Sequence, residues 1–212
     1  MGMQKRDTRE RILKEAVIIF SNKGYEGASM EEIAKKISIN KATIYHHFKG
    51  KKEILDTIIE NLIQETAAFR RQMAADALKA GTDNINEIVK NQADLRYNFL
   101  KEKTDVFSIL LADAIKKGDK DNYLFKYLDS TLNLVMKDET ERRLQEKYKM
   151  REILQKPEAF ISSIFLGVLP MILFLIISEK FAGYYNLELN ETEQIYKNLM
   201  VEIADFLRKK FV

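Results

Sequence analysis

Residues 40–55 read NKATIYHHFKGKKEIL, and this stretch decides the fold. Asn40 can accept a hydrogen bond from a free backbone N–H in the turn that follows, so it predicts the start of a short helix. Ile44 and Phe48 lie four residues apart on one face of that helix, which predicts that both are buried. The Lys-Gly pair at 49–50 ends it, because glycine breaks helical structure. Such a short helix must be stabilised by its neighbours.

Two further helices are predicted upstream. Residues 8–23 carry apolar side chains at the i, i+3, i+4, i+7 spacing of an amphipathic helix, and Gly24 is its stop. Ser29 and Glu32 have the spacing of a capping box, which starts a second helix of about nine residues. Residues 38–40 are too few and too polar to be more than a turn. Three short helices with a tight turn between the last two describe a helix-turn-helix unit.

These elements suggest two domains. The helix-turn-helix motif is expected at about 29–48, inside an N-terminal domain of residues 5–65. A fourth helix is expected from Lys51 to about 73 and connects this domain to a larger helical body of residues 66–212. Further helices are predicted in the body at 84–101, 104–116, 121–154 (with a break left open), 158–182 and 190–210. The chain is therefore expected to be all-α with about nine helices, since no alternating strand pattern is present.

Composition restricts the chemistry. The chain has no cysteine, which excludes disulfides and thiolate metal sites, and the two histidines are adjacent on a helix, where they point in different directions. We therefore expect no metal and no cofactor. Residues 1–52 hold twelve Lys or Arg and six Asp or Glu, whereas the remainder is mildly acidic. A basic head of this kind suits contact with a polyanion. The charged N-terminus does not resemble a signal peptide, so a cytoplasmic location is expected.

One apolar segment leaves two interpretations open. Residues 160–177 read FISSIFLGVLPMILFLII without a charge, which is borderline for a membrane-spanning helix. The segment holds serine, glycine and proline and has no flanking basic cluster, so burial against a second copy of the chain is favoured and no membrane partner is expected. With the C-terminal helix it would form a four-helix bundle in a homodimer. The interface is expected to include Phe165, Leu173, Phe174, Ile195, Leu199, Ile203 and Phe206.

The stretch at 40–55 closely resembles the recognition helix and following turn of TetR-family repressors. The upstream residues RERILKEAVIIFSNKGYEGASMEEIAKKISI resemble the same family, and the likeness covers about residues 8–60. The resemblance implies a homodimeric transcriptional regulator that binds a palindromic operator in double-stranded DNA. It also implies that the body binds a small-molecule effector and forms the dimer. An activator remains an alternative to a repressor. A membrane-associated protein with a cytosolic head is the alternative from another class.

The DNA-binding surface is expected on the third helix. Lys41, Thr43, Tyr45 and His46 lie away from the buried face, so they can enter a major groove. The resemblance implies phosphate contacts from Tyr45, His47, Lys51 and the Ser29 end of the second helix. It implies base contacts from Lys41, Ala42, Thr43 and His46, and Asn40 completes the predicted set. Alternatives are that Tyr45 and His47 fill a seam, that Thr43 is structural and that Lys51 is merely solvated.

Two positions depart from the family pattern. Ala42 stands where the family often has glycine, which limits close approach of the backbone to DNA. Glu31 and Glu32 begin the second helix, where some members carry a base-reading cation. Base contacts from that helix are therefore not expected.

The effector is expected to be a neutral or amphipathic hydrophobic molecule. Aromatic and thioether side chains can shape an adaptable apolar pocket, although any one of them could equally be ordinary core. The lining is expected to include Phe99, Phe107, Leu111, Tyr123, Tyr127, Met136, Phe165 and Met171. No nucleophile elbow, phosphate loop or metal triad is present in the sequence, so an enzyme is not expected.

Overall fold

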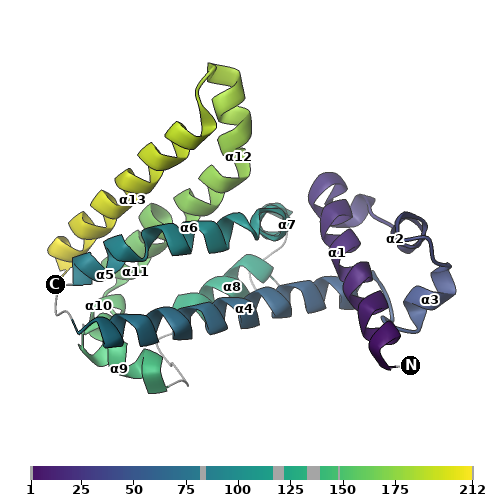
Figure 1. Ribbon diagram of the computed structural model, residues 1–212, viewed down its shortest axis with the longest axis horizontal. Helices are drawn as coiled ribbons and strands as arrows, with labels where there is room; N and C mark the ends of the chain where they lie inside the picture. The colour runs from purple at the N-terminus through teal and green to yellow at the C-terminus, as the bar shows by residue number, and fades with distance from the viewer. Residues whose placement is uncertain (1, 82–84, 117–121, 133–138, 148, 212) are drawn as a thin grey trace. The chain divides into compact units, whose positions relative to one another are not determined.

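The computed structural model describes residues 2–81, 85–116, 122–132, 139–147 and 149–211. Within these ranges every regular element is a helix, which confirms the predicted all-α class (Figure 1). The chain forms two units. Unit 1 comprises Met1–Thr66 and Asp105–Thr131, and unit 2 comprises Ala67–Thr104 and Leu132–Val212.

Unit 1 contains the three N-terminal helices. Its elements are α1 (Gly2–Gly27), α2 (Met30–Lys36), α3 (Lys41–Tyr45), the first half of α4 (Lys51–Ala80), α7 (Thr104–Lys116) and α8 (Tyr123–Leu132). Figure 1 shows α1, α2 and α3 gathered around the N-terminal end of α4. We call α1–α3 and the first turns of α4 the head.

The head is closed by a small apolar core. Ile44 is fully buried and Phe48 is 1% exposed, so the two core positions predicted for the third helix are confirmed. They lie with buried residues of α1, α2 and α4, namely Ile12, Ala16, Phe20, Ile33, Ile54 and Leu55. Each helix is too short or too polar to be stable alone, so this shared core fixes their arrangement.

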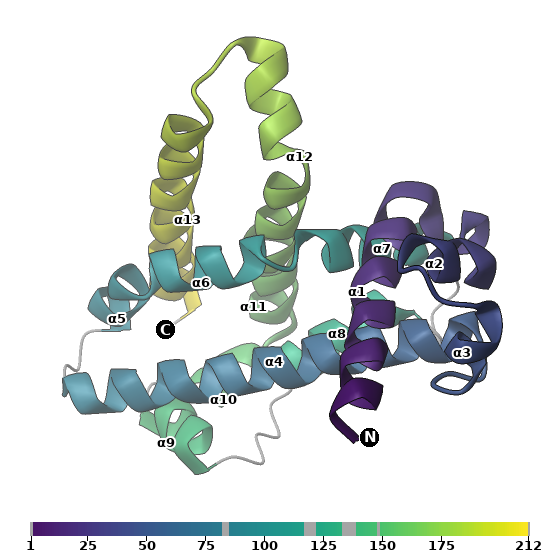
Figure 2. The same cartoon turned by 45° about the vertical axis from the view of Figure 1, so that its right-hand side comes forward.

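Unit 2 contains the remaining elements. They are the second half of α4, α5 (Ile85–Asn91), α6 (Ala93–Lys101), α9 (Glu139–Lys147), α10 (Met150–Leu154), α11 (Pro157–Ser162), the π-helical turn η2 (Ser163–Val168), α12 (Leu169–Tyr185) and α13 (Leu189–Phe211). Figure 2 shows α11, η2 and α12 following one another in line, with α13 returning antiparallel beside α12. The turn between them uses Asn186 in the left-handed conformation, with φ of 53°.

Some helix bounds differ from the prediction. Gly24 has φ of 75° and interrupts α1, but helical turns resume as far as Gly27. The segment predicted over 84–101 is divided into α5 and α6. The segment predicted over 121–154, where a break was left open, contains α8, α9 and α10, and residues 133–138 and 148 between them lie outside the described ranges. The division within α4 falls after Thr66, next to the predicted domain boundary. Nevertheless, α7 and α8 group with the N-terminal residues, which the sequence did not indicate.

Candidate nucleic-acid interface

Two side-chain caps set the geometry of the helix-turn-helix. The Ser29 hydroxyl accepts a hydrogen bond from the Glu32 N–H at 3.1 Å, which starts α2 as the capping-box spacing predicts. Asn40 Oδ1 accepts from the Thr43 N–H at 2.7 Å, which starts α3. Between the helices, Ser38 takes the left-handed conformation with φ of 57°. The caps fix where each helix begins and therefore which side chains α3 presents.

The exposed side of α3 carries mixed chemistry. Tyr45 is 48% exposed, and Lys41, Ala42 and His46 are also exposed, whereas His47 is half-buried. The Thr43 hydroxyl donates to Asn40 Oδ1 at 2.9 Å, so both side chains already serve the cap. The surface therefore offers a cation, a methyl group, a phenol and an imidazole together. DNA contact by the nine predicted residues remains a prediction.

The side chain of Lys51, the first residue of α4, contacts the end of α1. Its ammonium donates to the carbonyl oxygens of Tyr25 at 2.6 Å and Ala28 at 3.1 Å, and it lies 4.4 Å from the centre of the Tyr25 ring. The carbonyls that end a helix lack partners within it, and a cation satisfies them well. This geometry favours a positioning role for Lys51, which joins α4 to the end of α1. Sequence reasoning missed it, because the partners lie more than twenty residues away.

Replacing Lys51 by Ala is therefore expected to destabilise the head. Loss of charge-assisted hydrogen bonds to partly buried carbonyls should lower the free energy of unfolding by about 1–3 kcal/mol. The matched control is Lys52→Ala, which removes the same charge from the next residue. Lys52 is 76% exposed and pairs with Asp56, so its loss should cost less than about 1 kcal/mol. Thermal and urea unfolding compare the two. If both variants lose the same small amount of unfolding free energy, the positioning role of Lys51 is contradicted.

Two ion pairs join α2 to its neighbours. Glu31 pairs with Lys41 of α3, and Glu32 pairs with Lys23 of α1 at 2.5 Å. The hydrogen bond between Lys41 and Glu31 lowers the pKa of the Glu31 carboxyl and raises that of the Lys41 ammonium. Both stay ionised at neutral pH. The acidic start of α2 is thus paired with cations of the other two helices.

A polar link within unit 1 joins α8 to α4. The Tyr123 hydroxyl donates a hydrogen bond to the Asp56 carboxylate, which also accepts from Lys52 at 2.8 Å. Burial, and then the bond to Asp56, raises the pKa of the Tyr123 phenol. Burial acts to raise the pKa of Asp56, but the hydrogen bonds from Lys52 and Tyr123 outweigh it and hold the pKa below its ordinary value. Asp56 lies only five residues after Lys51, close to the head in the sequence.

The residues predicted to line a pocket are divided between the units. In unit 1, Phe107 and Tyr127 are buried and their rings meet edge to face at 5.3 Å. Tyr123 is also buried, and Leu111 is half-buried. In unit 2, Phe99 stacks on Phe69 at 4.3 Å, Met171 is half-buried and Phe165 is 63% exposed. The exposure of Phe165 favours its assignment to the dimer interface rather than to a pocket. Met136 lies outside the described residues.

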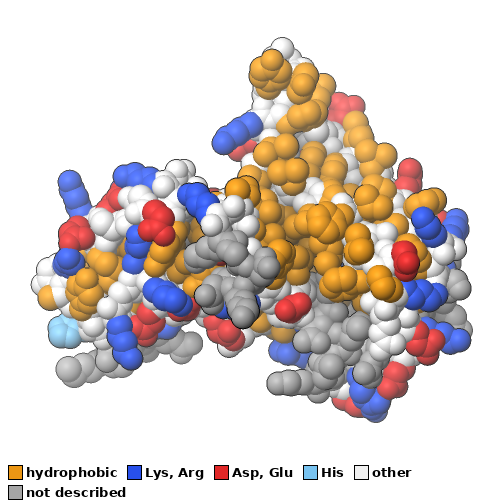
Figure 3. Space-filling model, turned by 180° about the vertical axis from the view of Figure 1, so that it is seen from behind, with side chains coloured by type: hydrophobic (Ala, Val, Ile, Leu, Met, Phe, Trp, Pro, Cys, Tyr) orange, Lys and Arg blue, Asp and Glu red, His pale blue; other side chains and the backbone are white. Residues whose placement is uncertain are grey.

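Unit 2 exposes a broad apolar face. Figure 3 shows hydrophobic side chains gathered over α11–α13. Its exposed members are Phe160, Ile161, Phe165, Leu166, Leu173, Ile177, Phe181, Tyr184 and Tyr185, followed by Leu187, Ile195, Leu199 and Phe206. Five of the seven predicted interface residues belong to this set. Phe174 and Ile203 are half-buried, and the Phe174 ring stacks on Tyr196 of α13 at 3.7 Å.

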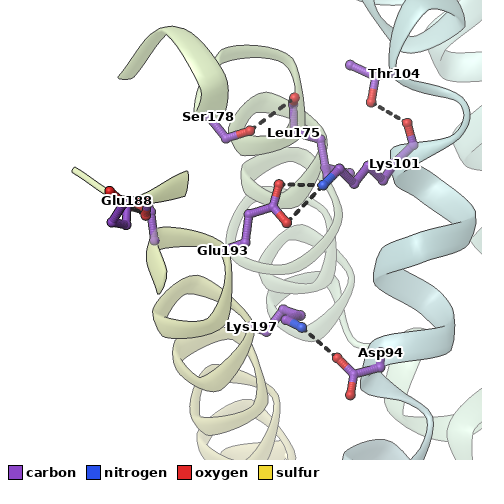
Figure 4. A network of polar contacts seen from close by, with 9 residues as sticks. Asp94, Lys101, Thr104, Leu175, Ser178, Glu188, Glu193 and Lys197 are labelled. Atoms are coloured by element: carbon purple, nitrogen blue, oxygen red, sulfur yellow. Dashed lines mark hydrogen bonds and ion pairs between the residues drawn. The ribbon is translucent and has the colours of Figure 1, made fainter. Parts of the chain in front are cut away.

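Ion pairs hold α13 against α6 behind this face. Lys101 donates to both carboxylate oxygens of Glu193, at 2.6 and 2.9 Å, and Lys197 donates to Asp94 at 2.7 Å (Figure 4). Glu193 is buried, so its charge needs the Lys101 partner. The network fixes α13 and leaves its apolar stripe outward. Among the described residues, no group of three or more acidic or histidine side chains is placed to hold a metal ion.

The sequence comparisons agree with this geometry. The family model for bacterial regulatory proteins of the TetR family matches residues 12–58, the helices of the head. Across 201 residues the chain is 24% identical to the Staphylococcus epidermidis negative transcriptional regulator of the biofilm operon icaADBC, IcaR. That match covers 95% of this chain and 100% of the relative. The N-terminal head therefore has the DNA-binding domain of the TetR family of transcriptional regulators. The same regulator of Staphylococcus aureus is 38% identical over 52 residues, covering 24% of this chain and 28% of the relative.

Solved structures share the fold of this chain. A transcriptional regulator from Aquifex aeolicus VF5 has a TM-score of 0.55 at 21% identity, covering 94% of this chain and 99% of that one. A Clostridium perfringens protein described as a regulator of fatty acid metabolism has a TM-score of 0.56 at 18% identity, covering 91% and 97%. At these identities the likeness concerns the fold. The TetR-type helix-turn-helix of the head, which the family model matches, identifies this chain as a DNA-binding transcriptional regulator.

Proposed function

We propose that the chain is a repressor that binds a palindromic operator as a homodimer and is released by a hydrophobic or amphipathic small molecule. The observation that carries the proposal is α3, a capped helix whose exposed side combines Lys41, Ala42, Tyr45 and His46. A helix of this size suits the major groove. The name of the Staphylococcus epidermidis relative, a negative regulator, supports repression. The site of action would be the cytoplasm.

The homodimer is proposed from the apolar face of α11–α13. Monomeric proteins seldom expose so many large apolar side chains together, and a second copy would cover them. Two helices from each copy would then form a four-helix bundle. A single short recognition helix contacts few base pairs. Two heads related by a two-fold axis read two half-sites, which makes a palindromic operator the natural target.

The alternative to a second copy is that the apolar face of α11–α13 contacts a membrane. Among the described residues, the helical stretch Pro157–Tyr185 is long and apolar enough to span one, with a mean hydropathy of 2.7 in a window that is 17% buried. Against this, α13 packs along α12 through the Phe174–Tyr196 stack. Helix α13 carries charged residues along its length, including Glu193, Lys197 and Asp205. Each charge placed in a bilayer costs about 2.5–3.5 kcal/mol, so a second copy is the better partner.

Operator binding is expected to fall steeply with salt. The basic head would neutralise several phosphates, and the counterions released make the logarithm of affinity decrease linearly with the logarithm of salt concentration. For about six phosphates, affinity should drop by about 1,000-fold between 50 and 200 mM salt. Fluorescence anisotropy with an operator selected from random DNA measures this, and native mass spectrometry gives the number of chains bound. One chain per selected site would contradict the dimeric form of the proposal.

The effector proposal rests on the aromatic residues of α7 and α8. Tyr123, one of the predicted lining residues, is hydrogen-bonded to Asp56 of α4, and α4 begins in the head. A ligand that forms a hydrogen bond with the Tyr123 hydroxyl would replace the bond between Tyr123 and Asp56 and shift α4. Release requires the ligand to bind the DNA-incompetent arrangement more tightly, since equal affinity for both arrangements shifts nothing.

A screen of lipophilic compounds tests the effector. Hits from thermal shift are expected to weaken operator binding, and Tyr123→Phe should reduce that response while leaving the fold intact. The matched control is Tyr97→Phe, because Tyr97 is a buried tyrosine like Tyr123 but lies on α6, outside unit 1. Compounds that stabilise the protein without changing operator affinity would contradict the coupling.

A further inference from the structure

Glu31 and Lys41 form one polar unit on the face of the helix-turn-helix. Glu31 lies in the first turn of α2 and Lys41 is the first residue of α3, and the ammonium donates a hydrogen bond to the carboxylate. Both side chains remain accessible, with 60% and 45% of their surface exposed. The ammonium also lies 5.8 Å from the centre of the Tyr45 ring. The pair is therefore positioned beside the exposed side of the recognition helix.

We propose that this ion pair reads a G·C base pair in the major groove, with Lys41 on guanine and Glu31 on cytosine. The inference rests on the proposed function, since it requires α3 to enter the groove. An ammonium has three donors, so the bond to Glu31 leaves two for guanine O6 and N7. The carboxylate has several acceptor positions and can take the cytosine N4 amine while it still accepts from Lys41. The pair need not break to bind.

The spacing of the two charged groups suits this base pair. Guanine O6 and cytosine N4 are hydrogen-bonded to each other, so they lie about 2.9 Å apart. The ammonium and the carboxylate are hydrogen-bonded as well and present a donor beside an acceptor at a similar spacing. Phosphates repel a lone carboxylate, whereas this one is neutralised by its partner. Glu31 can therefore enter the groove only because Lys41 accompanies it.

The same pattern disfavours the other base pairs. Reversal to C·G places the Lys41 ammonium against the cytosine amine, so that two donors meet. It also places the Glu31 carboxylate against guanine O6, so that two acceptors meet. In a T·A pair, thymine O4 and adenine N6 still place an acceptor beside a donor. Thymine, however, has no second acceptor corresponding to guanine N7, so Lys41 loses one contact and meets the thymine methyl group. Glu31 would face adenine N7, which is an acceptor like itself. An acidic residue at the start of α2, which the sequence alone indicated would not contact bases, becomes a determinant of specificity.

The neighbouring ion pair provides a matched control. Glu32 lies in the same turn of α2 and carries the same charge, but its partner is Lys23 of α1, and its side chain is only 25% exposed. Removing either carboxylate changes the net charge of the head equally. Any purely electrostatic effect on phosphate binding should therefore be alike in Glu31→Ala and Glu32→Ala.

The experiment selects an operator for the wild-type chain from random DNA and then replaces each half-site position by the other three base pairs. Wild type is expected to prefer G·C by about 10-fold or more at one symmetric position. Glu31→Ala should reduce that preference, because only the Lys41 contact with guanine is left, and it should still bind with unchanged thermal stability. Glu32→Ala should keep the full preference.

Three results would overturn the inference. They are a selected operator without such a G·C pair, an unchanged base preference in Glu31→Ala, and the same loss in both variants. Failure of the proposed function is a separate result, in which wild type selects no DNA sequence at all.

Discussion

Replacing Leu173 by Glu is expected to convert the proposed dimer into a monomer and to lower operator affinity by about 1,000-fold, close to the difference between specific and non-specific binding. Leu173 is 51% exposed at the apolar face of α12. An unpaired carboxylate buried in a dimer interface costs several kcal/mol, and it occurs twice across a two-fold axis. Sedimentation velocity at micromolar concentration measures the assembly, and fluorescence anisotropy measures operator binding.

Ile115→Glu is the control for this result. Ile115 is 87% exposed on α7 in unit 1, outside the apolar face, so the variant should stay dimeric and bind the operator normally. Leu173 is a sharper test than Phe174, because Phe174 stacks on Tyr196 and its loss would also loosen α12 from α13. A monomeric wild type, or a dimeric Leu173→Glu variant, would refute the interface.

Replacing Tyr45 by Ala is expected to weaken operator binding by about 100-fold without changing thermal stability. The ring is 48% exposed, so little of the core of the head is lost with it. In a dimer each substitution acts in both half-sites, and a lost contact of about 1–3 kcal/mol in each half-site accounts for an effect of this size. Operator titrations and thermal melts of the same preparations give both quantities.

Phe125→Ala is the matched control for Tyr45→Ala. Phe125 is an aromatic residue that is also 48% exposed, but it lies on α8. It should keep wild-type operator affinity. If Tyr45→Ala binds as tightly as this control, α3 is not the DNA-binding surface. A fall in melting temperature for Tyr45→Ala would instead assign the ring to packing within unit 1.

The sequence by itself determined the features that depend on residues close together in the chain. The caps at Ser29 and Asn40 act over three residues, and the burial of Ile44 and Phe48 follows from the helical period. Each of these signals is contained in one or two turns, so composition and spacing reveal it. The all-α class and the position of the helix-turn-helix follow from such local signals added together.

Only the tertiary structure decided which distant groups meet. Lys51 reaches the carbonyls at the end of α1, Tyr123 reaches Asp56 across 67 positions and Lys101 reaches Glu193 across 92. Periodicity predicts the face on which a side chain lies, but not which helix packs against that face. The same limit explains why α7 and α8 are predicted in the body but group with the N-terminal residues in the structure. It also explains why the sequence alone does not predict the pairing of Glu31 with Lys41. The role of a charged side chain depends on the group with which it pairs, and the packing of the helices decides which group that is.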